Sequence, residues 1–432
     1  MNASAVETSS LLSHRAGLSR GQPIGRLMAQ ALNYPNLLSL AAGFVDNATL
    51  PCAAVQDAMQ RLGGDALRLR KALQYDAAAG NVAFRSALAD WSYQHWPVAR
   101  PEPNRVILTA GSNQLLHLLV EALIDPGDIV LAAAPTYFVF LGTVRGAAGR
   151  VVGIAADEDG MCIDSLEKTL QSLAAAGQTR RVKAIYVVTD FDNPAGSSLS
   201  LHRREQLLEV VRRWRREHGP LLVLSDNAYQ HLRFDGPELP PLLALDPEAA
   251  EFVIELGTFS KSFSPGIRVG WGVVPETMVE PLLEIKSNMD FGSPHFSQVL
   301  MWEALSSGEV DRHLPDILRG YRLKRDSMLA ALDKHLGAAP GVHWRTPHGG
   351  LYVWLTLPEA IDAAEHAPLW THATRSGVLY VPGVYCFPPE GQPAQPNTMR
   401  LSYGVLSASG IDEAIARLAT ALGETSRELQ VP

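Results

Sequence analysis

The sequence predicts an α/β fold with a mainly parallel sheet and a smaller second domain. Short apolar segments rich in β-branched residues alternate with helical patterns from about residue 75 to residue 274, and this alternation is typical of parallel sheets. The turns that follow the predicted strands are polar, at residues 111–113, 135–137, 190–196, 225–229 and 257–268. Ligands bind outside the carboxyl ends of strands in open α/β sheets, so these turns are the first place to look for a site.

The helices are predicted from apolar residues spaced three and four apart. Pro51 marks the start of the second one, because proline is favoured in the first helical turn. The expected helices cover residues 23–33, 53–62, 82–94, 114–124, 202–218, 283–305, 309–336 and 411–422.

The strands are predicted from short β-branched or aromatic runs bounded by Gly and Pro. The Gly349-Gly350 turn and the alternation of Tyr352 with Trp354 indicate a hairpin of the second domain. Arg400 alternates with apolar neighbours and is expected to point off their face. The expected strands cover residues 37–42, 105–109, 129–134, 182–189, 221–224, 252–256, 269–274, 344–357, 377–383 and 398–403.

Length and composition limit the class of protein. A chain of 432 residues is expected to form two or three domains. Its net charge of -8 gives no basic face for nucleic acid or anionic lipid. Three cysteines far apart in the chain favour a reducing compartment over a disulfide framework or a zinc site. The longest uncharged run, residues 27–45, is broken by Pro35 and Gly43 and predicts no membrane span. We therefore expect a cytoplasmic enzyme.

Residues 257–268 carry the strongest chemical signal. Two hydroxyls (Thr258 and Ser260), the amine of Lys261 and the guanidinium of Arg268 lie between two predicted buried strands. Hydroxyls and a guanidinium suit a phosphate dianion. A partly desolvated lysine near positive charge is a candidate Schiff-base nucleophile. An aldehyde that carries a phosphate, such as pyridoxal phosphate, would satisfy all four groups. A lone Ser-Lys pair in a loop, however, is usually only a solvated charge.

Three further turns hold candidate residues, each with a structural alternative. Residues 111–113 precede a predicted helix and suit an anion, although the same residues also make a good helix cap. Tyr137 follows a strand and fits a ligand contact or a core position equally well. Asp226 and Tyr229 end another strand, where an unused carboxylate would be costly to bury.

Four motifs together resemble a known family. They are Ser260 to Trp271, Asn193-Pro194-Ala195-Gly196, Asp226-x-x-Tyr229 and Met399-Arg400-Leu401-Ser402. Each motif is weak singly, but their order along the chain is specific. Over about residues 23–422 the chain resembles the fold-type I pyridoxal-phosphate enzymes of the class I/II aminotransferases, nearest to the 2-aminoadipate and kynurenine aminotransferase branch.

The resemblance implies a fold, an activity and an assembly. The expected fold is a mainly parallel central sheet of the seven-stranded type with helices on both faces, plus a smaller α+β domain. The expected division is an N-terminal segment (1–60), a large cofactor-binding domain (61–305) and a small C-terminal domain (306–432). The enzyme would move an amino group from an L-amino acid to a 2-oxo acid, as a homodimer with shared active sites and without a metal.

The resemblance also assigns roles to residues. Lys261 would hold the cofactor and shuttle the proton at the substrate Cα, and Asp226 would pair with the pyridine nitrogen. The cofactor ring would contact Tyr229 and Asn193 at its 3-oxygen and Tyr137 on its face. The phosphate would be cradled by Gly111, Ser112, Asn113, Thr258, Ser260, Arg268 and the neighbouring subunit's Tyr75.

The remaining implied roles concern the substrate. Arg400 would clamp the α-carboxylate, assisted by Asn193 and Gly43. Arg26 lies where the aminoadipate-like enzymes keep an arginine for an acidic side chain, although an arginine on an amphipathic helix is usually a solvated charge.

Two departures from the family pattern leave alternatives open. The chain has Asp192 before Asn193 where the family usually has Gln, and its stretch at residues 46–51 is unusual. An extra carboxylate near the site could repel an acidic substrate or favour a basic one. The same scaffold could instead run an elimination, decarboxylation or cyclisation as a lyase, decarboxylase or cyclase. A ligand-sensing regulator is a third interpretation, but such proteins carry a DNA-binding domain ahead of this region, and the first 20 residues predict none.

Overall fold

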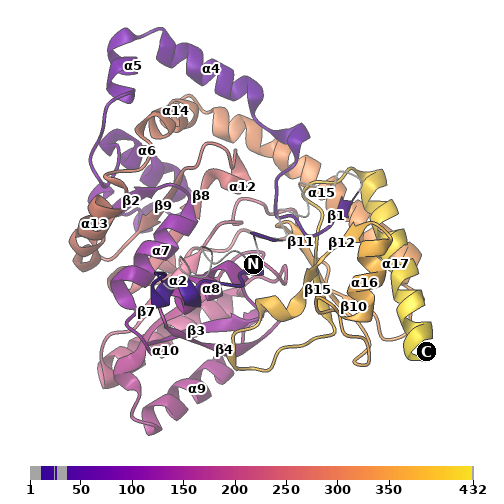
Figure 1. The fold of residues 1–432 in the computed structure, drawn as a ribbon. Helices are drawn as coiled ribbons and strands as arrows, with labels where there is room; N and C mark the ends of the chain where they lie inside the picture. The colour runs from indigo at the N-terminus through magenta and orange to yellow at the C-terminus, as the bar shows by residue number, and fades with distance from the viewer. Residues whose placement is uncertain (1–10, 24, 27–36, 431–432) are drawn as a thin grey trace.

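The computed structural model describes residues 11–23, 25–26 and 37–430 (Figure 1). Most of the helix that the sequence predicts at residues 23–33 lies outside these ranges. The described chain forms a large α/β region around one sheet and a smaller region with its own sheet, drawn in orange and yellow in Figure 1.

The central sheet has seven main strands, which run in the order β4-β3-β6-β7-β8-β9-β2. The five strands from β4 to β8 pair in parallel, whereas β9 is antiparallel to both of its neighbours. Two short strands, β14 (Glu390–Gly391) and β5 (Gly160–Met161), pair with β4 at the edge. The main strands are β2 (Val106–Thr109), β3 (Ile129–Ala134), β4 (Arg150–Asp157), β6 (Val182–Val188), β7 (Leu222–Asp226), β8 (Val253–Thr258) and β9 (Gly270–Val273).

Helices cover both faces of this sheet because its strands are apolar on both sides. Along β2, Ile107 packs into one core while Val106 and Leu108 pack into the other. One face is covered by α7 (Ser112–Leu123), α8 (Phe138–Gly146) and α13 (Glu276–Asp290). The other is covered by α6 (Val82–Ser92), α9 (Ile163–Ala175), α10 (Leu201–His218) and α14 (His295–Ser306). The predicted mainly parallel sheet with helices on both faces is confirmed.

The smaller region is built on an antiparallel sheet in the order β10-β11-β15-β13. Its apolar core also includes residues from the long helix α15 (Glu309–Leu336). The other elements are β10 (His343–Trp344), β11 (Tyr352–Thr356), β13 (Val381–Pro382), β15 (Thr398–Ser402), α16 (Pro368–Arg375) and α17 (Ala408–Leu429), with β1 (Leu38–Ser39) paired to β12 (Val378–Leu379). The hairpin predicted at residues 344–357 is present as β10 and β11.

One predicted helix is wrong. The sequence predicts a single helix over residues 283–305, but α13 ends at Asp290 and α14 begins at His295. Phe291 and Gly292 adopt positive φ angles of 55° and 117°, and Pro294 precedes α14. A left-handed pair followed by a proline ends a helix.

Several elements have no counterpart in the sequence prediction. They include β4, α8, α9, α16, α2 (His14–Leu18), α5 (Ala66–Ala72), α11 (Leu242–Leu245) and the single turn α12 (Phe259–Ser262). Helix α4 (Cys52–Gly63) was predicted at residues 53–62 and extends one residue further at each end.

Candidate active site

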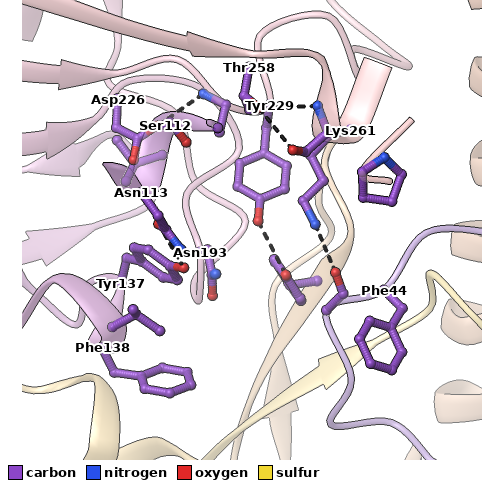
Figure 2. A pocket seen from close by; sticks show the side chains of 18 of the residues that line it. Phe44, Ser112, Asn113, Tyr137, Phe138, Asn193, Asp226, Tyr229, Thr258 and Lys261 are labelled. Atoms are coloured by element: carbon purple, nitrogen blue, oxygen red, sulfur yellow. Dashed lines mark hydrogen bonds between the residues drawn. The ribbon is translucent and has the colours of Figure 1, made fainter. Parts of the chain in front are cut away.

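A cavity of about 390 Å³ lies where the carboxyl ends of the parallel strands meet the smaller region (Figure 2). The carboxyl ends of β2, β3, β6, β7 and β8 and the turns after them contribute most of its wall. The segment after β1 and strands β11 and β15 contribute the rest. The residues that line it are Gly43, Phe44, Gly111, Ser112, Asn113, Tyr137, Phe138, Val139, Tyr186, Val188, Asn193, Asp226, Ala228, Tyr229, Thr258, Ser260, Lys261, Pro265, Arg268, Tyr352 and Arg400. Nearly all of the predicted site residues therefore share one cavity.

Lys261 enters this cavity from α12, the single helical turn that follows β8. The hydroxyl of Thr258 caps the turn by accepting a hydrogen bond from the Ser260 amide at 3.1 Å. The Lys261 amine donates to the backbone oxygen of Gly43 at 2.8 Å. Burial lowers the pKa of Lys261, and the nearby Arg400 and Arg268 charges lower it further. A lowered pKa increases the share of neutral amine, which is the nucleophilic form.

Asp226 ends β7 on the opposite side of the cavity (Figure 2). Its carboxylate accepts hydrogen bonds from the Tyr186 hydroxyl at 2.9 Å and the Ala228 amide at 3.1 Å. Burial raises the pKa of Asp226 to about 6, although both hydrogen bonds oppose the shift. A cationic nitrogen placed against this carboxylate would stabilise its charged form. Tyr186, which orients Asp226, was not singled out in the sequence because it lies inside an apolar strand.

The part of the cavity wall at the start of α7 suits an anion. Helix α7 begins at Ser112 after Gly111, and no side chain of the described residues caps it, so its first N–H groups are available to bind a ligand. Gly111 has a φ of 83°, and a Cβ there would lie 2.8 Å from Nη2 of Arg268. Arg268 donates to the backbone oxygens of Ala110 at 3.1 Å and Pro265 at 3.3 Å. Helix N–H groups, a guanidinium and the Ser260 hydroxyl fit a phosphate.

Arg400 lies on β15 and is only 3% exposed. It donates to Oδ1 of Asn193 at 2.8 Å and to the backbone oxygen of Ala41 at 2.6 Å. Its Nε is buried and has no hydrogen-bond partner within the described part of the chain. A buried guanidinium with a donor to spare on a cavity wall suits a carboxylate ligand.

Two predicted site residues lie away from the cavity. Tyr75 is 77% exposed and makes an edge-to-face contact with Phe291, with ring centroids 5.5 Å apart. Arg26 pairs with the carboxylate of Glu365 and lies 3.3 Å from the Tyr385 hydroxyl. Neither Tyr75 nor Arg26 lines the cavity. Their predicted roles stay predictions.

Asp192 also lies behind the cavity wall instead of lining it. The residue is 7% exposed, and Oδ1 has no hydrogen-bond partner among the described residues. Burial raises the pKa of Asp192 to about 8, so the group is mostly neutral near pH 7. Burial thus weakens the effect that its charge could have on a substrate, and the role predicted for Asp192 in substrate choice stays a prediction.

Comparison with known proteins identifies the family. The sequence model of the family described as aminotransferase class I and II matches residues 35–418. The chain belongs to this family. It is 34% identical to aromatic-amino-acid aminotransferase 1 of Thermococcus litoralis, over 93% of this chain and 92% of that protein. It is 33% identical to 2-aminoadipate transaminase of Thermus thermophilus, over 93% and 96% of the two chains.

A solved structure supports the same conclusion. The crystal structure of Pyrococcus horikoshii kynurenine aminotransferase, in complex with PMP and with kynurenine described as substrate, superposes with a TM-score of 0.89. The two sequences are 31% identical, and the match covers 98% of this chain and 99% of that one. Membership of the 2-aminoadipate and kynurenine branch, predicted from the motifs, is confirmed.

This class I/II aminotransferase transfers an amino group from an amino acid to a 2-oxo acid with pyridoxal phosphate as cofactor. The lyase, decarboxylase and cyclase alternatives are not favoured. Within the described residues, no cluster of three or more His, Cys, Asp and Glu side chains could hold a metal. No described helix is both long enough and apolar enough to cross a bilayer.

Proposed function

We propose that the cavity binds pyridoxal phosphate with its ring between Asp226 and Tyr137 and its phosphate at the start of α7. When bound, the cofactor supplies an aldehyde for the amino group and a ring that withdraws electrons from Cα. Asp226 would face the pyridine nitrogen, and Tyr229 and Asn193 would donate to the 3-oxygen. The proposal is supported by the anion-binding end and the buried carboxylate, which lie on the same cavity as Lys261.

Lys261 would act at both ends of the reaction. Its amine, with a pKa lowered by burial, is suited to take the proton from the substrate Cα and to deliver it to the aldehyde carbon of the cofactor. Arg400 would hold the substrate α-carboxylate through N–H groups that face the cavity, so that the Cα–H bond faces the lysine. The same clamp serves the amino acid and the 2-oxo acid, because both carry this carboxylate.

The preferred amino donors would carry uncharged aromatic or large aliphatic side chains. One observation supports this choice: the cavity wall includes the apolar side chains of Phe44, Phe138 and Val139, and the Phe138 ring lies 5.8 Å from the Arg400 guanidinium. Arg26, the residue offered for an acidic side chain, already has its charge compensated by Glu365. An acidic donor would have to compete with that carboxylate for the guanidinium.

The donor class can be tested with a panel that includes phenylalanine, leucine, kynurenine, 2-aminoadipate and glutamate, with 2-oxoglutarate or pyruvate as acceptor. We expect kcat/KM for the aromatic donors to exceed that for 2-aminoadipate about tenfold, which corresponds to roughly 1.4 kcal/mol. The variant Glu365→Gln frees Arg26 and should raise the relative rate of the acidic donors. A wild-type preference for 2-aminoadipate would contradict the proposed donor class.

We propose that the enzyme acts in the cytoplasm as a homodimer with shared sites. Large apolar side chains are exposed on neighbouring segments of the large region, including the Tyr75–Phe291 pair: Leu67, Leu73, Tyr75, Val82 and Phe291. An apolar patch of this kind is typical of a protein interface. A second copy that covers it would bring Tyr75 to the partner's phosphate site.

Mixed dimers test the shared site. Lys261→Ala and Tyr75→Ala each damage one contribution to a site. If Tyr75 acts on the partner's cofactor, mixing the two variants forms one fully intact site in each mixed dimer, and activity rises above that of either variant alone. If Tyr75 acts within its own chain, no intact site can form. Analytical ultracentrifugation of the wild type measures the assembly directly.

A further inference from the structure

Tyr352 is a cavity residue without an assigned role. It begins β11, directly after the Gly349-Gly350 turn, and it is 2% exposed. β11 pairs with β15 so that Tyr352 lies opposite Ser402 and diagonal to Arg400 on the same face of the sheet. The smaller region thus delivers both an aromatic ring and the clamp arginine to one wall of the cavity.

Both ends of the Tyr352 side chain contact proposed active-site residues. Its hydroxyl lies 3.2 Å from the hydroxyl of Tyr229, which comes from the large region, and the two rings meet at 76°. Its ring lies under the guanidinium of Arg400, at 4.3 Å from the ring centroid. A cation over an aromatic face at this distance is attractive, and more so when both groups are buried.

We propose that Tyr352 is a positioning residue: its hydroxyl donates to Tyr229 and strengthens the hydrogen bond of Tyr229 to the cofactor 3-oxygen, while its ring holds Arg400 in place. This inference rests on the proposed placement of the cofactor.

The direction of the hydrogen bond follows from the number of protons. Each phenol carries one proton, and either oxygen of the pair could donate to the other. Once the O–H group of Tyr229 donates its hydrogen bond to the cofactor oxygen, only Tyr352 can donate in the hydrogen bond between the two tyrosines. A hydroxyl that accepts a hydrogen bond becomes a stronger donor itself, because neighbouring hydrogen bonds polarise each other. The Tyr352 hydroxyl therefore acts on the cofactor through Tyr229.

The backbone of Gly43 leaves room for this hydroxyl. A Cβ on Gly43 would lie 2.8 Å from the Tyr352 hydroxyl oxygen. The carbonyl oxygen of the same glycine accepts the hydrogen bond of Lys261 at 2.8 Å. Tyr352 thus packs directly against the segment whose carbonyl binds the catalytic amine. Any larger residue at position 43 would displace either the Tyr352 hydroxyl or the backbone that accepts the hydrogen bond of Lys261.

Other charged and titratable groups also act on this pair. Tyr137 raises the pKa of Tyr229 while Arg400 lowers it, and burial has the largest effect. Tyr321 and Tyr403 approach Tyr352 from within the smaller region. Tyr186, Asp226, Lys261 and Arg268 complete the set of ionisable side chains on the cavity wall. None of these other side chains makes a hydrogen bond with the Tyr352 hydroxyl in the described chain.

The test is the pH midpoint of the visible absorbance of the cofactor-loaded protein. A donor on the 3-oxygen withdraws electron density that would otherwise hold a proton on the Lys261 nitrogen. Tyr352→Phe keeps the ring and weakens that donor, so the midpoint should rise by about half a pH unit. Tyr229→Phe should raise it further. The double variant should match Tyr229→Phe alone, because Tyr352 acts through Tyr229.

Tyr403→Phe is the matched control. Tyr403 is also buried in the smaller region and donates to the backbone oxygen of Gly349 at 3.1 Å, but it does not line the cavity. It should leave the midpoint unchanged. The ring function is tested by KM for the amino donor, which should rise severalfold in Tyr352→Leu but stay near the wild-type value in Tyr352→Phe.

The outcomes separate this inference from the site on which it rests. A midpoint that moves in Tyr229→Phe but not in Tyr352→Phe overturns the inference, as does a double variant with fully additive shifts. A midpoint that moves in neither variant shows instead that Tyr229 does not contact the cofactor, and the proposed placement fails. A protein with no visible absorbance would reject the bound cofactor itself.

Discussion

Replacement of Arg400 by alanine gives the sharpest test of the proposed substrate clamp. Two of its N–H groups already donate to Asn193 and to the backbone of Ala41, at 2.8 and 2.6 Å. A guanidinium has five N–H groups, and a substrate carboxylate that accepts from two of those on the cavity side gains two charge-assisted hydrogen bonds. Such bonds contribute about 1.5–3 kcal/mol each, and their loss from a buried pair costs roughly 3–5 kcal/mol.

This free energy converts into a large kinetic effect. We expect kcat/KM for any α-amino acid to fall about 150- to 5000-fold in Arg400→Ala, since each 1.36 kcal/mol is a factor of ten. Arg400→Lys should keep part of the rate, because lysine retains the charge but not the two-pronged geometry. The assay is a single-turnover half-reaction followed by the visible absorbance of the cofactor, together with steady-state kcat/KM.

Two controls make the result specific to the carboxylate. Arg375 is exposed and pairs with Glu424 on the surface, so Arg375→Ala should leave kcat/KM unchanged. A primary amine that lacks a carboxylate should react at similar low rates in the wild type and in Arg400→Ala. If Arg400→Ala kept its fold, its cofactor and a specificity constant within threefold of the wild type, the clamp role would be refuted.

Three further predictions concern the lysine, the buried acid and the glycine. Lys261→Ala should retain its far-ultraviolet circular dichroism but lose turnover and the visible absorbance of the wild type; normal turnover would contradict the assignment. Burial raises the pKa of Asp192 to about 8, so between about pH 4 and pH 8 the folded protein keeps a proton that the unfolded chain has released, and the free energy of unfolding falls as pH rises. The Tm of Asp192→Asn should therefore rise relative to the wild type between about pH 4 and pH 8, and a constant difference in Tm would show that Asp192 does not titrate there. Gly43→Ala places a Cβ 2.8 Å from the Tyr352 hydroxyl oxygen and should destabilise the protein by about 1–3 kcal/mol; Tyr352→Phe should relieve part of this loss in thermal unfolding, and a purely additive double variant would contradict the contact.

Local sequence patterns were sufficient for the long elements. Helix α15 and strand β3 lie at their predicted residues, because apolar spacing and flanking glycine or proline act over a few residues. The break between α13 and α14 was missed because the pattern stays apolar on both sides of Gly292. Lys286 lies within the helix predicted at residues 283–305, where it is buried and pairs with Asp290. Periodicity reports which side of a helix is apolar, but not what packs against a single charged residue.

Some residues of the site could be predicted from local sequence patterns, and others could not. Lys261, Asp226 and Arg268 were found from the turns that hold them, because polar residues at strand ends are a local signal. Tyr186 and Tyr352 were missed as site residues, since a tyrosine within an apolar strand is most often part of the core. The signal in the sequence for Tyr352 was its alternation with Trp354. If β11 is paired with the strand that carries Arg400, this alternation places Tyr352 on the same face as Arg400.

The sequence by itself determined the class of fold, the cofactor chemistry and the order of the motifs, because each depends on residues close together in the chain. Only the tertiary structure decided which of these residues share a cavity, since strands 100 or more positions apart meet at one edge of the sheet. It also decided the charge state of buried groups. Asp192 reads as a negative charge in the sequence, but loss of water around it favours the neutral acid. Desolvation depends on what surrounds a side chain in three dimensions, and no local pattern records it.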